Sequence, residues 1–127
     1  MLIINGVEVV VGPYIKDPRV QWGDVTYTDN HTVTLDQSGK TLIMNSSSNK
    51  TFTLPSVAAA DIGTEFTFIN INTGKLTIDA ADSDTIDDSN AGGTIYSDDN
   101  TIASIAIRLV SATHWQIIGA NGVWTTT

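Results

Sequence analysis

The chain has 127 residues and carries 14 acidic against 6 basic side chains, for a formal net charge of −8. This charge repels nucleic-acid phosphates, so we expect no DNA or RNA partner. The absence of cysteine excludes disulfides, thiolate nucleophiles and cysteine-based zinc sites. No apolar run approaches the roughly 20 residues that span a bilayer, so we expect no membrane partner either.

The chain begins with two short apolar runs, Leu2–Ile4 and Val7–Val11, on either side of Asn5-Gly6. Asn-Gly between such runs is a strong signal for a tight hairpin. The next segment, Gly12–Gly23, has two prolines and no alternation. We therefore predict an N-terminal hairpin and extended arm over residues 1–23, and a separate module over residues 24–127.

Two interpretations of the arm remain open. It is a linker whose aromatic side chains fold back on the core, or it inserts into a neighbouring subunit or a partner. Aromatic residues with arginine are common anchors of interfaces, and prolines lower the cost of ordering such a segment. The second interpretation predicts a partner interface made of Tyr14, Ile15, Lys16, Arg19 and Trp22.

We predict that the remainder of the chain forms short strands. These strands are rich in threonine, valine and isoleucine, whose branched side chains suit a pleated sheet. The predicted strands are Val25–Thr28, Thr32–Leu35, Thr41–Asn45, Thr51–Leu54, Glu65–Ile71, Lys75–Asp79, Gly93–Tyr96, Ile102–Val110 and Trp115–Ile118. Turn residues separate them at intervals of about 8–12 residues, which favours a sandwich or barrel over βαβ units. The predicted fold class is therefore all-β: a single antiparallel β-sandwich or barrel-like module.

Alternation along these strands predicts which side chains face the core. The predicted inward residues are Phe66, Phe68, Leu76, Ile78, Ile105, Ile107, Leu109, Trp115 and Ile117. The segment Asn72-Thr73-Gly74 predicts a tight turn between two antiparallel strands. One helix-like patch, Ser56–Ile62, predicts a single turn or a loop, with Ser56 as its N-cap and Gly63 as its stop.

The acidic run Asp79–Asp88 is the obvious candidate for a metal site, because calcium prefers several oxygen ligands on a flexible loop. A calcium loop of the EF-hand type starting at Asp82 would place isoleucine at position five and glycine at position twelve, so that pattern fails. A solvated acidic turn is the favoured interpretation. The two histidines, His31 and His114, lie in unrelated segments and are read as structural.

No nucleophile elbow, phosphate-binding glycine loop or pair of carboxylates in a cleft is indicated. We therefore predict no enzymatic activity, no catalytic residues, no cofactor and no metal. Trp115, Trp124 and Tyr96 could form a platform on which sugars stack, but large aromatic residues more often lie in a core or an interface.

Several segments of the chain resemble small β-modules of tailed-bacteriophage virion proteins, which are found in tail fibres, head fibres and capsid decoration (cement) proteins. These segments are Thr51–Pro55, Gly63–Asn70, Gly74–Ile78, Asp84–Asp87 and His114–Trp124. The resemblance as a whole covers roughly residues 40–124. It implies a virion structural protein that assembles as a homotrimer around a three-fold axis.

The short length of the chain favours one class among these virion proteins. A fibre normally needs a shaft of coiled coil or repeated β-segments, and the chain shows neither. We therefore expect a capsid decoration (cement) protein on the outer capsid surface of the virion, bound to the major capsid protein. The alternative is a small head- or tail-fibre receptor-binding module that recognises a host surface glycan.

Overall fold

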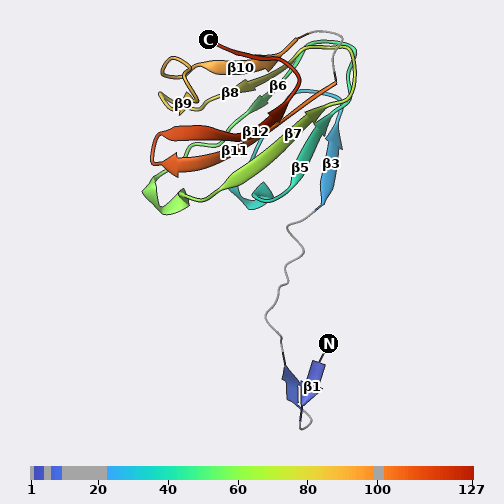
Figure 1. Ribbon diagram of the computed structural model, residues 1–127, viewed down its shortest axis with the longest axis vertical. Coiled ribbons are helices and arrows are strands. Elements are labelled where there is room, and N and C mark those ends of the chain that lie inside the picture. Colours follow the sequence, from blue (N-terminus) through green and yellow to red (C-terminus); the bar gives the residue numbers. More distant parts are fainter. Residues whose placement is uncertain (1, 5–6, 10–22, 99–101) are drawn as a thin grey trace.

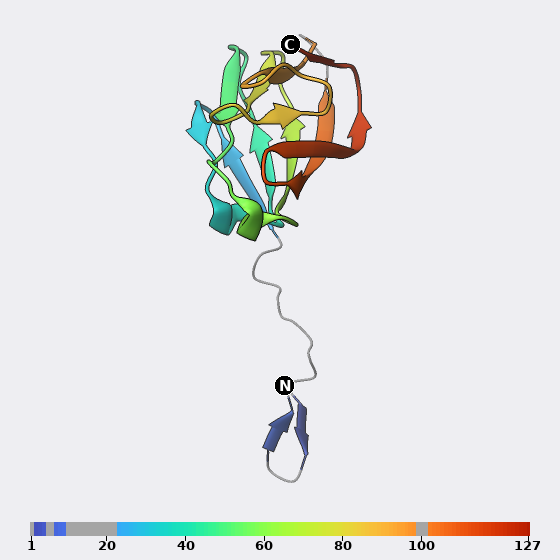
Figure 2. The ribbon, with the colours of Figure 1, turned by 90° about the vertical axis from the view of Figure 1, so that its left-hand side faces the viewer.

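Two β-sheets face each other in the described part of the chain and enclose one hydrophobic core (Figures 1 and 2). The structure is a computed structural model that describes residues 2–4, 7–9, 23–98 and 102–127. The prediction of an all-β sandwich is confirmed, and the helical turns among these residues are short 3₁₀ segments.

The six-stranded sheet consists, in spatial order, of β3 (Asp24–Tyr27), β5 (Thr41–Met44), β7 (Glu65–Asn70), β11 (Ala103–Ser111), β12 (His114–Asn121) and β9 (Thr85–Ile86). The five-stranded sheet consists of β13 (Trp124–Thr126), β10 (Thr94–Ser97), β8 (Leu76–Asp79), β6 (Lys50–Thr53) and β4 (His31–Thr32). The predicted N-terminal hairpin is present as β1 (Leu2–Ile4) and β2 (Val7–Val9), paired antiparallel. The arm predicted to follow it lies outside the described residues.

From β3 to β8 the chain changes sheet after every strand. Strands β3, β5 and β7 therefore lie side by side in one sheet, and β4, β6 and β8 lie side by side in the other. Within each sheet these neighbours are parallel, with Val25 opposite Leu42 and Leu42 opposite Phe68. The first half of the module is thus a flattened coil of parallel strands.

This winding corrects the prediction of purely antiparallel pairing. The segment Asn72-Thr73-Gly74 does not close a hairpin, because β7 and β8 lie in different sheets. Gly74 instead packs against the loop between β5 and β6, and its N–H donates to the Ser46 carbonyl at 3.0 Å. Alternation of side chains shows which face of a strand is buried but is the same for parallel and antiparallel neighbours.

The second half of the module completes both sheets with antiparallel strands. Strand β11 pairs with β7 on one side and with β12 on the other, and β10 pairs with β8 and β13. Two strands were missed by the sequence pattern, β9 and β13, because each is too short to show alternation. Strand β9 is parallel to β12, with Ile86 opposite Trp115.

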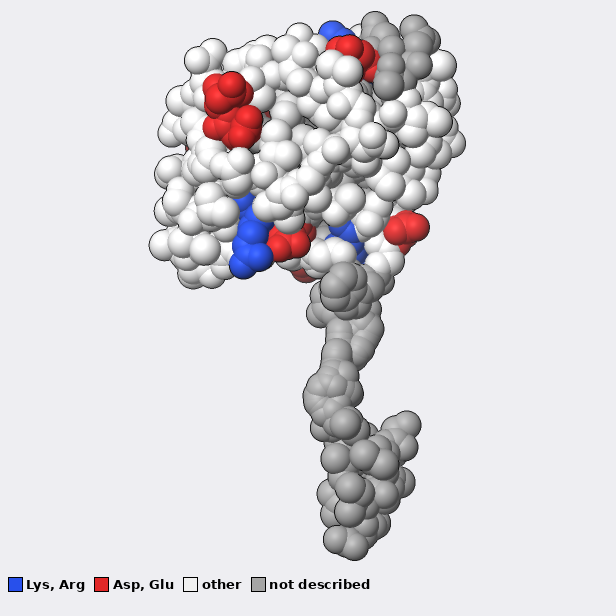
Figure 3. Space-filling model, viewed as in Figure 1, with Lys and Arg blue, Asp and Glu red and all other residues white. Residues whose placement is uncertain are grey.

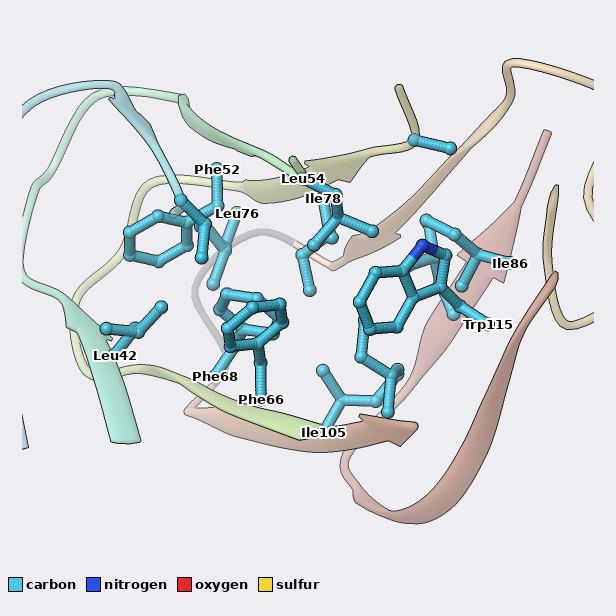
Figure 4. Close-up of a cluster of buried hydrophobic side chains, with 14 of the residues drawn as sticks. Leu42, Phe52, Leu54, Phe66, Phe68, Leu76, Ile78, Ile86, Ile105 and Trp115 are labelled. Atoms are coloured by element: carbon cyan, nitrogen blue, oxygen red, sulfur yellow. The ribbon is translucent and has the colours of Figure 1, made fainter. Parts of the chain in front are cut away.

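Aromatic rings from both sheets meet at the centre of the core (Figure 4). Phe52 of the five-stranded sheet lies 5.1 Å from Phe68, and Phe66 lies 5.5 Å from Trp115, measured between ring centroids. Of the nine predicted inward residues, eight are fully buried and Ile117 is partly buried against the same core. Burial of each such side chain stabilises the fold by about 1.5–3 kcal/mol.

Two 3₁₀ turns precede equivalent strands of the coil. The turn η3 (Leu35–Gln37) leads into β5, and η4 (Ala59–Asp61) leads into β7. In each turn the side chain of the last residue accepts a backbone N–H at the start, from Thr34 to Gln37 at 3.2 Å and from Ala58 to Asp61 at 2.9 Å. The predicted turn at Ser56–Ile62 is confirmed, but it starts after Ala58 rather than after Ser56.

We expect Gly74→Ala to lower the free energy of unfolding by about 1–3 kcal/mol, because a Cβ at this position would lie 2.0 Å from the Ser48 carbonyl oxygen. Gly119→Ala is the matched control, since its Cβ would meet nothing within 4 Å. Urea denaturation of both variants measures the difference. Equal stability of the two variants would contradict the packing of Gly74 under the β5–β6 loop.

Candidate interaction surface

The partner interface predicted in the arm lies outside the described residues. Its members are Tyr14, Ile15, Lys16, Arg19 and Trp22. Their role in binding therefore stays a prediction.

The acidic loop between β8 and β9 contains one buried carboxyl group. Asp84 is 5% exposed, and its Oδ2 has no hydrogen-bond partner. Burial, together with the charge of Asp82, raises the pKa of Asp84 above its ordinary value. Burial likewise raises the pKa of Asp79. Among the described residues, no three acidic or histidine side chains gather closely enough to hold a metal ion.

The aromatic residues do not form a sugar-stacking platform. Trp115 is fully buried in the core, where no ligand can stack on it. Trp124 packs against the core, and its indole N–H donates to the Ser104 carbonyl at 3.1 Å. Because Ser97 pairs with Trp124 and Tyr96 with Thr125, Tyr96 projects from the opposite face of its sheet.

Both histidines make contacts within the fold. The ring of His31 stacks on Tyr27 with centroids 4.0 Å apart, and its Nε2 lies 2.9 Å from Gln37 Oε1. His114 Nδ1 lies 2.6 Å from the Thr85 hydroxyl, which ties β12 to β9. These contacts fit the structural interpretation of the two residues.

The outer face of the six-stranded sheet carries apolar side chains among uncharged polar ones such as Thr41, Thr67 and Ser104. We name its apolar part the apolar face, and the side chains of this part are Ile43, Ile69, Ile71, Ile102, Ala106 and Ile118. Register places Ile43 opposite Ile69, and Thr67 opposite Ala106. Three of these residues are among the most exposed large hydrophobic side chains of the described residues: Ile71 at 43%, Ile102 at 69% and Ile118 at 52%.

Charged groups lie at the margins of this face (Figure 3). Glu65 and Arg108 are opposite each other on β7 and β11, and they form an ion pair of 2.9 Å. Asp24 lies on the edge strand β3. Exposed apolar side chains that gather on one face can mark a contact with another molecule.

Strand β12 adds a free edge beside the apolar face. It pairs with β9 at His114 and Trp115, while its remaining residues pair with β11 alone among the described strands. A register shift between β11 and β12 leaves Ile118 as an extra residue at this point. Ile118 follows the inward-facing Ile117, and its side chain is exposed to solvent.

Comparisons of the chain with models of protein families, with curated proteins and with solved structures found no match. Within the described residues there is no pocket, and no helix is long and apolar enough to cross a membrane. The apolar face therefore stands as the candidate functional surface on its own geometry.

The buried carboxyl group of Asp84 predicts a pH effect on stability. Its pKa is higher in the folded state than the ordinary value of 3.8, so its contribution is fully present below about pH 4 and is lost as the pH rises through the folded pKa. We expect the free energy of unfolding of the wild type, relative to Asp84→Asn, to increase as the pH falls from about 7 to about 5.

Chemical denaturation across this pH range measures the effect. Asp98→Asn removes one negative charge at an exposed position and is the control. A difference between wild type and Asp84→Asn that stays constant with pH would show that the carboxyl group is not desolvated in the folded state.

Proposed function

We propose that this protein is a structural protein of a tailed-bacteriophage virion, most specifically a capsid decoration (cement) protein. It binds the outside of the shell, contacts the major capsid protein, associates with itself as a homotrimer and carries out no catalysis. The observation that carries the proposal is the apolar face, a broad uncharged surface on an otherwise acidic sandwich. The resemblance of residues 40–124 to phage virion β-modules supports the same class.

The mechanism we propose is passive. Each copy buries surface against coat subunits, and several symmetric copies on one particle add their contacts through avidity. In this proposal the N-terminal arm supplies the contact to the shell through Tyr14, Ile15, Lys16, Arg19 and Trp22. Aromatic and arginine side chains suit this role because they bury large areas and bind specifically.

Acidity fits display at high local concentration. The formal net charge of −8 keeps neighbouring copies from adhering through their charged surfaces. Only uncharged areas, or the segment Gly12–Gly23 in which Lys16 and Arg19 outnumber the single acid Asp17, can then make close contacts. Contact formation is in this way restricted to defined parts of the molecule.

The alternative, a fibre module that recognises a host glycan, has less support. It relied on an exposed aromatic platform, and Trp115 is buried while Trp124 and Tyr96 lie on opposite faces of one sheet. A screen of the purified protein on host polysaccharides is the direct test of this alternative. Tight binding that Trp124→Ala abolishes would favour it over the decoration protein.

We expect a chain that lacks residues 1–23 to fold but to lose attachment to capsid shells. Among the described residues, the core and the side chains packed against it begin at Val25, after the deleted segment. The measurement is cosedimentation with shells assembled from the coat protein encoded in the same genome. The full chain and an Arg19→Ala/Trp22→Ala double variant are run beside the deletion.

Three results are informative. Binding by the full chain and its loss in both variants would support the proposal. Undiminished binding by the truncated chain would refute the arm as the contact. Failure of the full chain to bind any shell would refute decoration itself.

A further inference from the structure

We infer that residues 82–87, which we name the β9 flap, form a proton-operated cover on the edge of β12. The flap stays closed when the Asp84 side chain carries a proton, and it opens more often when that side chain is ionised. The segment consists of β9 and the residues on either side of it. The inference is separate from the proposed function, because the movement takes place within one copy and involves no coat protein.

The β9 flap is attached to β12 through a short strand. Strand β9 has two residues and lies at the edge of the six-stranded sheet. The Thr85 N–H donates to the Thr113 carbonyl at 2.9 Å, and the Asp87 N–H donates to the Trp115 carbonyl at 2.8 Å. Between them, the Ile86 side chain is fully buried. A short edge strand of this kind opens at a smaller cost in free energy than the central strands of the sheet.

Both ends of the flap hold a strained backbone. Asp82 has a φ of 52° and Asp87 a φ of 53°, in the left-handed region. Aspartate enters this region more readily than most residues, but still at a cost in free energy. Among the residues that the structure describes, no other residue with a side chain has a positive φ. Opening of the flap relieves this strain, so the two aspartates are natural hinge points.

The carboxyl group of Asp84 is enclosed within the flap. The side chain is 5% exposed, and its Oδ2 has no hydrogen-bond partner. Opening of the flap gives water access to this oxygen. Because a buried charge without a partner costs more free energy than a buried neutral carboxyl group, ionisation of Asp84 favours the open form.

The surrounding elements offer Asp84 no compensating positive charge. Strands β8, β9, β10, β12 and β13 and the loop between β8 and β9 contain neither lysine nor arginine. Arg108 of β11 is paired with Glu65. Burial, together with the charge of Asp82, raises the pKa of Asp84. The titratable side chains on the flap and the elements next to it are Asp79 on β8, Asp82, Asp87 and Asp88 around β9, Tyr96 on β10 and His114 on β12.

The test measures amide hydrogen exchange by NMR in the full chain at about pH 5 and about pH 7. The amides of Thr85 and Asp87 report on the flap, since both donate to β12. The amide of Phe68 is the reference, because β7 lies between β5 and β11 and this residue is fully buried. Urea at about 0.5–1 M separates the two kinds of opening, because global unfolding exposes far more surface than a flap does.

We expect the two flap amides to exchange faster than the Phe68 amide and to respond less to urea. The closed form holds the proton more tightly, so its advantage is complete at low pH and is lost as the pH rises through the pKa of Asp84 in the closed form. Protection factors of the flap amides should therefore increase at least about threefold as the pH falls from about 7 to about 5.

Two variants assign the effect to one side chain. Asp84→Asn keeps the size of the side chain without its titration, so the protection of its flap amides should not depend on pH. Asp98→Asn removes a charge at an exposed position and should behave like the wild type. An unchanged pH dependence in Asp84→Asn would overturn the inference.

The wild type alone also decides the matter if Asp84→Asn does not fold. Flap amides whose protection is the same at both pH values would show that Asp84 does not control opening. Flap amides that match the Phe68 amide in both protection and response to urea would show that the flap opens only when the whole module unfolds. Either result refutes the β9 flap.

Discussion

Burial of alternate side chains from two sheets into one core is the constraint on which the rest of the structure depends. Phe52, Phe66, Phe68 and Trp115 occupy the centre of this core, and a shift of any strand by one residue would turn its apolar side chains to solvent. The constraint fixes register in both sheets at once. It also explains how a chain without cysteine holds a defined structure, since a core of this kind needs no covalent crosslink.

The winding of the first half of the module adds a second constraint. Wherever the chain crosses from one sheet to the other, its backbone N–H and C=O groups pass over an end of the sandwich and need hydrogen-bond partners. Asn70 supplies them at one crossing: its Nδ2 donates to the Gly74 carbonyl at 2.8 Å and to the Ser97 hydroxyl at 3.1 Å. This buried contact joins the two sheets directly. The crossing is therefore held by specific hydrogen bonds as well as by apolar burial.

Because the inner faces serve the core, the outer faces are the part of the described module on which function can act. The outer face of the six-stranded sheet carries exposed apolar side chains among uncharged polar ones, and in Figure 3 the charged residues lie around a wide uncharged area. This separation distinguishes a contact surface from a surface that only keeps the protein soluble. The functional proposal follows from it: a compact scaffold acts by contact, and the location of its charges restricts where contact occurs.

The amino-acid sequence by itself determined the fold class and the core. Alternation is a local property, so it identified Phe66, Phe68 and Trp115 as inward residues before any neighbour was known. The sequence also distinguished residues 1–23 from the rest of the chain. The binding role proposed for residues such as Trp22 in this segment remains a prediction. Only the tertiary structure decided the parallel pairing of β3, β5 and β7, because alternation does not depend on the direction of the neighbouring strand. The apolar face likewise emerged only in three dimensions, since the order of strands in the six-stranded sheet brings Ile43, Ile102 and Ile118 onto one face from distant parts of the chain.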